Sequence, residues 1–378
     1  MSTGTLPLDE DTADLLALAR QIADGELAPR AAGYETESRF PREVLTILGK
    51  AGLLGLPFAE QYGGAAQPYA VYVQVLEILA GRWLSVAESV NINTIACHAI
   101  EKHGTESQRE TYLPALLDGS MLAANCMSEP QAGSDIAALS TRAVREDDVY
   151  VVNGTKAWVS HAGVADLYLL YCRTGGVDAR GISCLLADAT TPGLLPQPPE
   201  QKMGVRSNPT AELVLDAARI PADRLLGREG RGFLVAMDTV GCGRLGIAAC
   251  AVGLAQAALD YAVSYAKSRE QFGQRVISFQ GLAFLLADLA TWVSAARALT
   301  QHAARLRDAG QPFETEAAKA KLFATDVAMR VTTEAVQVLG GYGYVTDHPV
   351  ERWMREAKLL QIVEGTNQIQ RLVISRTL

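Results

Sequence analysis

Hydrophobic residues change their spacing twice along this chain, and that order of patterns restricts the possible folds more than any other property of the sequence. Helical spacing comes first, short β-rich segments follow, and long helical segments close the chain. A Rossmann fold needs strands that alternate with helices, so this order excludes it. The glycine-rich run at 340–344 follows a helical segment and is therefore not a dinucleotide-binding turn. The predicted domains are residues 1–120, which are helical, residues 121–226, a small β-domain, and residues 227–378, a helical bundle.

Capping and turn signals predict the ends of several of these elements. Asp9 can cap a first helix, Pro41 opens another, and Thr105 with Gln108 has the spacing of a capping box. Asn153-Gly154 lies between β-rich arms and is the strongest short signal for a hairpin turn. The helix expected at 85–100 is unusually polar, and a solvated face is the favoured interpretation for at least two of its polar residues.

Composition and charge narrow the classes of function. The net charge of −8 and the lack of a Lys/Arg tract argue against nucleic acid as the main partner. The N-terminus lacks the basic leader and apolar core of a secretory signal, and no apolar run approaches the roughly 20 residues that span a bilayer. The six cysteines are scattered and no His cluster has ligand spacing, so neither a disulfide framework nor a metal site is predicted. We expect a cytoplasmic protein with reduced thiols.

Polar residues gather in two stretches of the predicted β-domain. Ser128 follows a strand, and Gly133 with Ser134 places N–H groups and a hydroxyl in a loop that can bind the polar edge of a planar ring. Taken alone, this stretch is more simply a capped loop. Trp158 and Ser160 follow, and the indole can lie beside a ring, although a core tryptophan is the simpler interpretation.

Two helix ends in the last region carry residues suited to a phosphate ligand. Arg269 follows a long helix and is a good partner for a diphosphate, with a charged helix terminus as the alternative. Gln337 precedes Gly340 and Gly341, and because a helix C-cap requires only one glycine, close approach of a ligand is plausible there.

One carboxylate near the end of the chain stands apart from other charges. Glu364 follows the apolar pair Ile362-Val363 and precedes Gly365 and Thr366, which allow close approach and supply a hydroxyl. This pattern fits a helix N-terminus, and it also fits a general base held against a bound organic group.

Together and in this order, these motifs make the sequence resemble the acyl-CoA dehydrogenase family over nearly its whole length. The segments that carry the resemblance are PFAEQYGG, MSEPQAGSD, KAWVS, KMGVRS, SREQFG, QVLGGYGY and IVEGTNQIQR. The resemblance implies a mainly α fold with an N-terminal helical domain, a central β-barrel and a C-terminal four-helix bundle. It also implies one FAD per subunit of a homotetramer, a dimer of dimers in which FAD is held partly across an interface.

The resemblance assigns most of the residues above to the cofactor. The flavin ring would lie against Met127, Ser128, Trp158 and Ser160, with Gly133 and Ser134 nearby. The diphosphate and adenosine would be held by Arg269, Gln271, Gln280, Gln337, Gly340 and Gly341, and further FAD contacts match Thr366 and Gln368. The residues that match substrate-side positions are Ser134, Arg244, Gly365 and Asn91.

The resemblance also makes Glu364 the catalytic base. An α-proton of a thioester is only weakly acidic, so the base must be desolvated and the developing enolate oxygen must be hydrogen-bonded. In the family, the β-hydrogen then leaves as hydride to flavin N5, and an electron-transfer flavoprotein takes the electrons. Some relatives carry the base close to the position of Arg244, but Val240-Gly-Cys-Gly-Arg244 has no carboxylate.

Departures from the family pattern leave the substrate open. Many members have an acidic residue at the position of Gly241 that contacts the pantetheine arm, so an acyl group on a carrier protein is an alternative to acyl-CoA. Asn91 falls near the expected floor of the acyl pocket, which points to a short or polar acyl chain. An oxygen-using acyl oxidase or monooxygenase on the same fold is a further alternative, and a non-catalytic or DNA-associated relative is another.

Overall fold

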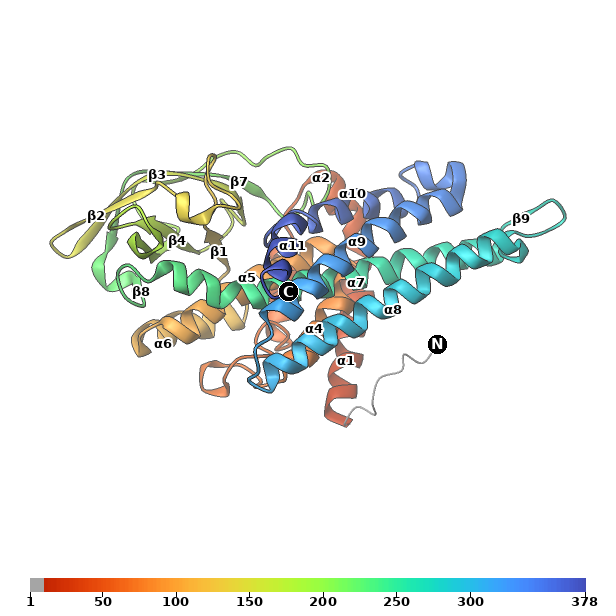
Figure 1. Cartoon of the computed structure of the whole chain (residues 1–378), viewed down its shortest axis with the longest axis horizontal. Coiled ribbons are helices and arrows are strands. Elements are labelled where there is room, and N and C mark those ends of the chain that lie inside the picture. The colour runs from red at the N-terminus through yellow and green to blue at the C-terminus, as the bar shows by residue number, and fades with distance from the viewer. Residues whose placement is uncertain (1–9) are drawn as a thin grey trace.

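The computed structural model describes residues 10–378, and this part of the chain is mainly helical (Figure 1). Helices come first, strands follow and helices return, which is the order that the hydrophobic spacing predicts. The first helices are α1 (Glu10–Ile22), α2 (Ala28–Glu37), α3 (Arg42–Lys50), α4 (Tyr69–Ala80), α5 (Leu84–His103) and α6 (Glu106–Leu117). The later helices are α7 (Gly232–Ser268), α8 (Gln280–Asp308), α9 (Glu314–Leu339), α10 (Val350–Leu360) and α11 (Asn367–Ser375).

Two of the predicted helix starts can be followed at atomic detail. The N–H of Gln108 donates to Thr105 Oγ1 at 3.2 Å, and the Gln108 side chain accepts from the N–H of Thr105 at 3.0 Å, so the capping box of α6 is confirmed. Pro41 immediately precedes α3, as expected. Asp9 lies outside the described residues.

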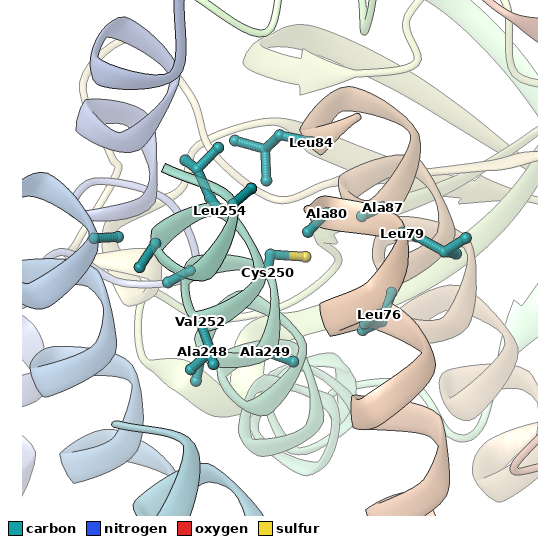
Figure 2. Packing of buried hydrophobic residues seen from close by; sticks show 14 of the residues in the cluster. Leu76, Leu79, Ala80, Leu84, Ala87, Ala248, Ala249, Cys250, Val252 and Leu254 are labelled. Carbon is teal, nitrogen blue, oxygen red and sulfur yellow. The ribbon is translucent and has the colours of Figure 1, made fainter. Parts of the chain in front are cut away.

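Helix α7 is the central core helix of the molecule. Its middle third is almost continuously buried, and small side chains there let α4 and α5 approach closely. Gly253 shows how close this approach is, because a Cβ at that position would overlap the backbone carbonyl of Glu77. Figure 2 shows Ala248, Ala249, Cys250, Val252 and Leu254 of α7 beside Leu76, Leu79, Ala80, Leu84 and Ala87.

Two helices, α7 and α8, are long and apolar enough to cross a membrane by length and composition alone. Core helices share this length and composition, and 89% of the apolar window of α7 is buried inside the molecule. The corresponding window of α8 is only 22% buried. The expectation that no apolar run approaches the length of a membrane span missed the apolar segments in both helices.

The strands form one mixed sheet of eight strands rather than a closed barrel. The order is β6-β7-β3-β2-β4-β5-β8, and β1 pairs with β4. Over residues 10–378 the outer strands β6 and β8 do not pair with each other, so the predicted barrel is not closed. Both are very short, which limits pairing at a sheet edge. The strands are β1 (Ala123–Cys126), β2 (Arg142–Glu146), β3 (Val149–Ser160), β4 (Leu167–Arg173), β5 (Ile182–Asp188), β6 (Leu194–Pro196), β7 (Thr210–Pro221) and β8 (Leu225–Leu226).

A separate two-stranded ribbon, β9 (Glu270–Gln271) with β10 (Gln274–Arg275), projects from the far end of the helical bundle (Figure 1). The ribbon follows directly after α7, whereas the eight-stranded sheet covers the opposite end of the molecule. The two β-structures are thus widely separated.

The predicted hairpin turn at Asn153-Gly154 is wrong. Strand β3 runs through both residues, and the turn that joins it to β2 contains Asp147, which has a φ of 53°. Gly154 lies instead where β3 shifts its register against β7, and a Cβ there would be 2.6 Å from Thr141 Oγ1. The glycine therefore permits close approach of Thr141 and does not turn the chain.

Candidate active site

The Glu364 carboxylate points from the loop between α10 and α11 toward helix α7. A Cβ on Gly243 of α7 would lie 2.5 Å from Glu364 Oε2 and 2.9 Å from Ile95 Cδ1 of α5, so both side chains meet at this glycine. Glu364 has a left-handed φ of 53°, and Gly365 follows with a φ of 81°. This tight turn, together with the missing side chain at 243, brings the carboxylate against the helix.

Helix α11 holds the turn from one side. The Gln370 amide donates to the carbonyl oxygen of Gly365 at 2.7 Å and to that of Glu364 at 3.2 Å. Thr366 caps α11 by accepting the N–H of Ile369 at 3.3 Å. The Thr366 hydroxyl therefore serves the helix start in this structure.

Helix α9 holds the same turn from behind. The Nζ of Lys321 donates to the Gly365 carbonyl at 3.0 Å and to Asn367 Oδ1 at 2.9 Å. Its side chain has no exposed surface. Burial lowers the pKa of Lys321 to about 8, although the charge of Glu364 opposes this.

The charges around Glu364 have opposite effects on its ionisation. Burial raises the pKa of Glu364 above its ordinary value, and the nearby carboxylate of Glu88 adds to this, whereas Arg244 and Lys321 lower it. Arg244 adjoins Gly243 on α7, and within the described part of the chain its Nε has no hydrogen-bond partner. The net effect is a carboxyl group that binds a proton more tightly than an exposed glutamate.

Helix α5 forms the wall beside this carboxylate. Asn91 is buried, its Nδ2 donates to the Gly243 carbonyl at 3.3 Å, and its side chain fills the space that a Cβ on Gly246 would need. The expected solvated face on α5 is wrong, because the helix packs against α7, α6 and β1. Four polar residues of this helix that could have formed such a face are all buried, namely Glu88, Asn91, Asn93 and His98.

A second part of the site lies after β1, next to a bulge in β3. The Ser128 carbonyl accepts the N–H of Ala157 at 2.9 Å, which lays the 127–128 segment along β3. The bulge gives Trp158 a φ of 59° and leaves its side chain 66% exposed, so it is not a core tryptophan. Met127 and Ser160 are half-buried beside it, and Gly133 and Ser134 are exposed.

A buried ion pair fixes this second part. Lys156 Nζ lies 2.7 Å from Glu129 Oε1, and neither side chain is exposed by more than 1%. Glu129 also accepts the N–H of Thr141 at 2.9 Å and the N–H of Ser140 at 2.6 Å. Burial alone would raise the pKa of Glu129, but Lys156 and the hydrogen bonds outweigh it and lower the pKa to about 2.

A third group of predicted residues meets at the far end of α7. They line a groove of about 560 Å³, where the Arg269 guanidinium lies 5.7 Å from the centre of the Tyr342 ring. Gln280 begins α8 and does not line the groove, and Gln368 is exposed on α11. From Gly243 to the end of α7, the helix rises roughly 38 Å at about 1.5 Å per residue. The predicted residues that do line the groove are Arg269, Gln271, Gln337, Gly340 and Gly341.

Three family models match successive parts of the chain. They describe the N-terminal, middle and C-terminal domains of acyl-CoA dehydrogenases and match residues 9–120, 124–218 and 230–378. The chain belongs to the acyl-CoA dehydrogenase family. Among relatives, it is 41% identical over 360 residues to the short-chain specific acyl-CoA dehydrogenase of Clostridium acetobutylicum, with 95% of each protein covered.

Solved structures of acyl-CoA dehydrogenase relatives share the fold. The butyryl-CoA dehydrogenase of Megasphaera elsdenii superposes with a TM-score of 0.96 at 39% identity, over 99% of each chain. A chain from a structure described as the electron transferring flavoprotein of Acidaminococcus fermentans gives a TM-score of 0.97 at 40% identity, again over 99% of each chain. The protein is thus an oxidoreductase that acts on acyl-CoA, with the three-domain fold and flavin cofactor of its family.

Sequence reasoning missed several residues that build the candidate site. Gly243 and Gly246 lie three residues apart in an apolar helix, and this spacing is a usable signal for close approach of another element. Lys321 gave no signal, because a lysine inside a helical pattern is normally exposed. Gln370 likewise looks like an ordinary polar residue of a terminal helix.

Proposed function

We propose that this protein is an FAD-dependent dehydrogenase that introduces the α,β-double bond into a short acyl-CoA thioester, with Glu364 as the base. The observation that carries the proposal is the contact of the Glu364 carboxylate with the side-chain-free face of α7 at Gly243. Its burial raises the pKa, and a carboxylate of raised pKa is a better acceptor for a weakly acidic α-proton. When bound, FAD supplies the acceptor for the β-hydride at flavin N5.

The chain also offers a donor for the thioester carbonyl. Across residues 10–378, no acceptor is hydrogen-bonded to the backbone N–H of Glu364, whereas the carbonyl of the same residue is held by Gln370. This N–H can therefore donate to the oxygen on which negative charge develops as Glu364 removes the α-proton. Ile95, which meets Glu364 at Gly243, places an apolar side chain beside the base.

A short acyl chain is supported by the walls of the site and by the relatives. Asn91 and Ile95 close the space between α5 and α7 next to Glu364, at Gly246 and Gly243 respectively. The compared proteins are named for short-chain and butyryl-CoA substrates. We therefore assign this protein an acyl-CoA of about that length, with Ser134, Arg244 and Gly365 on the substrate side.

The residues present fit an FAD shared between subunits. The exposed Trp158 indole, with Met127, Ser128 and Ser160, offers a surface for the flavin ring, and the Arg269 groove offers a cation for the diphosphate. A Cβ on Gly340 or Gly341 would meet no atom within 4 Å, so the groove is open there. Because these two surfaces are far apart on one chain, we propose that a partner's groove completes each site.

This arrangement leads us to propose a homotetramer, a dimer of dimers. The apolar and largely unburied α8 supports an interface at the bundle, since its exposed side chains include Phe284 and Trp292. The match to a chain from an electron transferring flavoprotein structure supports that class of protein as the electron acceptor. Six buried, unpaired thiols support a reducing, cytoplasmic location.

Anaerobic bleaching of the bound flavin by a series of acyl-CoA thioesters tests this function. The four-carbon thioester should bleach the wild-type protein fastest, and Glu364→Gln should lose about 10²- to 10⁴-fold or more in rate while still binding FAD. Glu316→Gln is the matched control, because Glu316 lies on α9 and pairs with the partly exposed Lys319. Bleaching of Glu364→Gln within about tenfold of wild type would reject Glu364 as the base.

A further inference from the structure

Lys321 is an unusual residue to find behind the turn that carries the Glu364 carboxylate. It is fully buried on α9, yet within residues 10–378 its Nζ contacts carbonyl oxygens and no carboxylate at ion-pair distance. Its hydrogen bonds go instead to two neutral oxygens, the Gly365 carbonyl and Asn367 Oδ1. A buried ammonium group held only by neutral oxygens is costly, so its retention calls for an explanation beyond packing.

The rest of the same helix face continues this support. Asp326 accepts the amide of Gln361 at 2.7 Å and the amide of Asn367 at 2.7 Å, and Arg371 pairs with its other oxygen at 3.1 Å. Thr325 accepts a further hydrogen bond from Asn367 at 3.0 Å. The turn that carries Glu364 is therefore clamped at both ends to α9, and Lys321 is the contact nearest its centre.

We propose that Lys321 is a positioning residue, which fixes the Glu364 turn through the Gly365 carbonyl and whose positive charge favours the ionised form of Glu364. The catalytic meaning of this role rests on the proposed function of Glu364 as a base. The hydrogen bond to the Gly365 carbonyl, called the tether below, and the positive charge are two separate effects of one side chain. Different substitutions distinguish these two effects.

The charged groups that face these two residues are few. Lys321 is influenced by Glu364, by Arg244 of α7 and by Asp326 of α9. Glu364 is influenced by the same arginine, by Lys321 and by Glu88 of α5. Because its pKa is about 8, Lys321 is charged in neutral solution and loses its charge as the pH rises through that value. Its removal leaves Arg244 as the cation that still opposes the effect of burial on Glu364.

An infrared titration of the Glu364 carboxyl group tests the charge without any turnover. The carbonyl stretch of a protonated carboxylic acid is followed against pH in the FAD-loaded protein, and the band missing from Glu364→Gln identifies the residue. We expect the midpoint in Lys321→Met to rise by about one pH unit, as removal of a nearby opposite charge requires. Lys319→Met is the matched control, because Lys319 is partly exposed on the same helix, and its midpoint should equal that of wild type.

A second variant separates the tether from the charge. Lys321→Gln removes the charge but keeps an N–H donor for the Gly365 carbonyl, so it should shift the midpoint in the same direction. Amide hydrogen exchange over 362–366 should quicken in Lys321→Met and change less in Lys321→Gln, because only the methionine loses the donor. If Lys321→Met fails to fold, Lys321→Gln alone decides the effect of the charge.

An unchanged midpoint in Lys321→Gln or Lys321→Met would overturn the proposal, and so would a shift of the same size in Lys319→Met. The pH dependence of flavin bleaching should move in parallel with the infrared midpoint. If no acyl-CoA bleaches the flavin but the infrared shift is present, the proposed reaction fails and the link between Lys321 and Glu364 stands.

Discussion

Two fully buried lysines support two of the three parts of the candidate site, and their surroundings differ. Lys156 supports the loop beside Trp158 and has a carboxylate, Glu129, at 2.7 Å. Lys321 supports the Glu364 turn and has two neutral oxygens as hydrogen-bond acceptors. The side chains are alike in burial and differ in whether the partner neutralises the charge.

The difference separates a structural role from an electrostatic one. In the Lys156–Glu129 pair the charges cancel, and the remaining carboxylate lone pairs bind Ser140 and Thr141, so the pair holds a fixed loop. The charge of Lys321 is not cancelled within its own contacts, so its field reaches Glu364. Substitutions beside Lys156 should therefore act mainly on stability, and substitutions beside Glu364 mainly on the reaction.

The largest effect on folding is expected from Lys156→Met. It leaves the Glu129 carboxylate buried without its partner, which typically costs about 3–5 kcal/mol in the free energy of unfolding. Lys321→Met should cost less, because it removes an uncompensated charge and Gln370 still donates to the Gly365 carbonyl. Urea unfolding of both variants measures this. Equal losses would mean that the two lysines are equivalent.

The same pair predicts a loss of stability in acid. With a pKa of about 2, Glu129 stays ionised in the folded protein below pH 4.5, where the unfolded chain takes up a proton. The unfolded state then binds more protons, so the free energy of unfolding contributed by this group is present above about pH 4.5 and is lost as the pH falls toward 2. Urea unfolding across this range should show a shallower decline for Glu129→Gln. An identical slope would contradict the assignment.

A smaller and mainly catalytic effect is expected from Gly243→Ala. The new Cβ would lie 2.5 Å from Glu364 Oε2 and 2.9 Å from Ile95 Cδ1, so the carboxylate must move away from α7 and the end of the Ile95 side chain must shift. A displacement of about 1 Å costs on the order of 10²-fold in rate, while the free energy of unfolding should change little, because the higher helix propensity of alanine offsets the shift of Ile95. Flavin bleaching and thermal unfolding measure the two effects. Gly281→Ala is the control, because a Cβ at 281 of α8 meets no atom within 4 Å.

The smallest effect is a change in chain-length preference. Asn91→Ala removes the side chain that fills the space beside Gly246, which should admit a longer acyl group. The ratio of kcat/KM for a six-carbon over a four-carbon thioester should rise by at least about tenfold, since the two chains differ by two methylenes and each is worth about 1 kcal/mol or more in such a pocket. A constant ratio would remove Asn91 from the determinants of substrate length.

Much of the fold followed from local patterns. Helical spacing gave the long helices, and the capping box at Thr105 and Gln108 depends only on residues three apart in the chain. The hairpin at Asn153-Gly154 was wrong because the pairing of β3 with β7 is a long-range contact that outweighs the local turn preference. Closure of the sheet likewise depends on edge strands that are distant in sequence.

The candidate site shows the same limit. The sequence singled out Glu364 because an acid beside apolar residues and a glycine is locally distinctive. The burial of the polar face of α5 could not be predicted from the sequence. The hydrogen-bond partners of Asn93 are the Leu116 carbonyl and the Ala123 N–H, which only the folded chain brings near. The burial of Lys321 could not be predicted for the same reason, because it depends on the loop that follows α10.

The bulge that turns Trp158 outward has a spectroscopic consequence. Of the four tryptophans, Trp83 and Trp353 are buried, Trp292 is 38% exposed and Trp158 is 66% exposed. The most water-exposed indole of the chain thus stands where the flavin ring is proposed to lie. Its emission should be quenched as cofactor is added to the apoprotein, and Trp158→Phe should remove most of that signal. The fluorescence of Trp158 should therefore report what fraction of the protein carries cofactor, without substrate or electron acceptor.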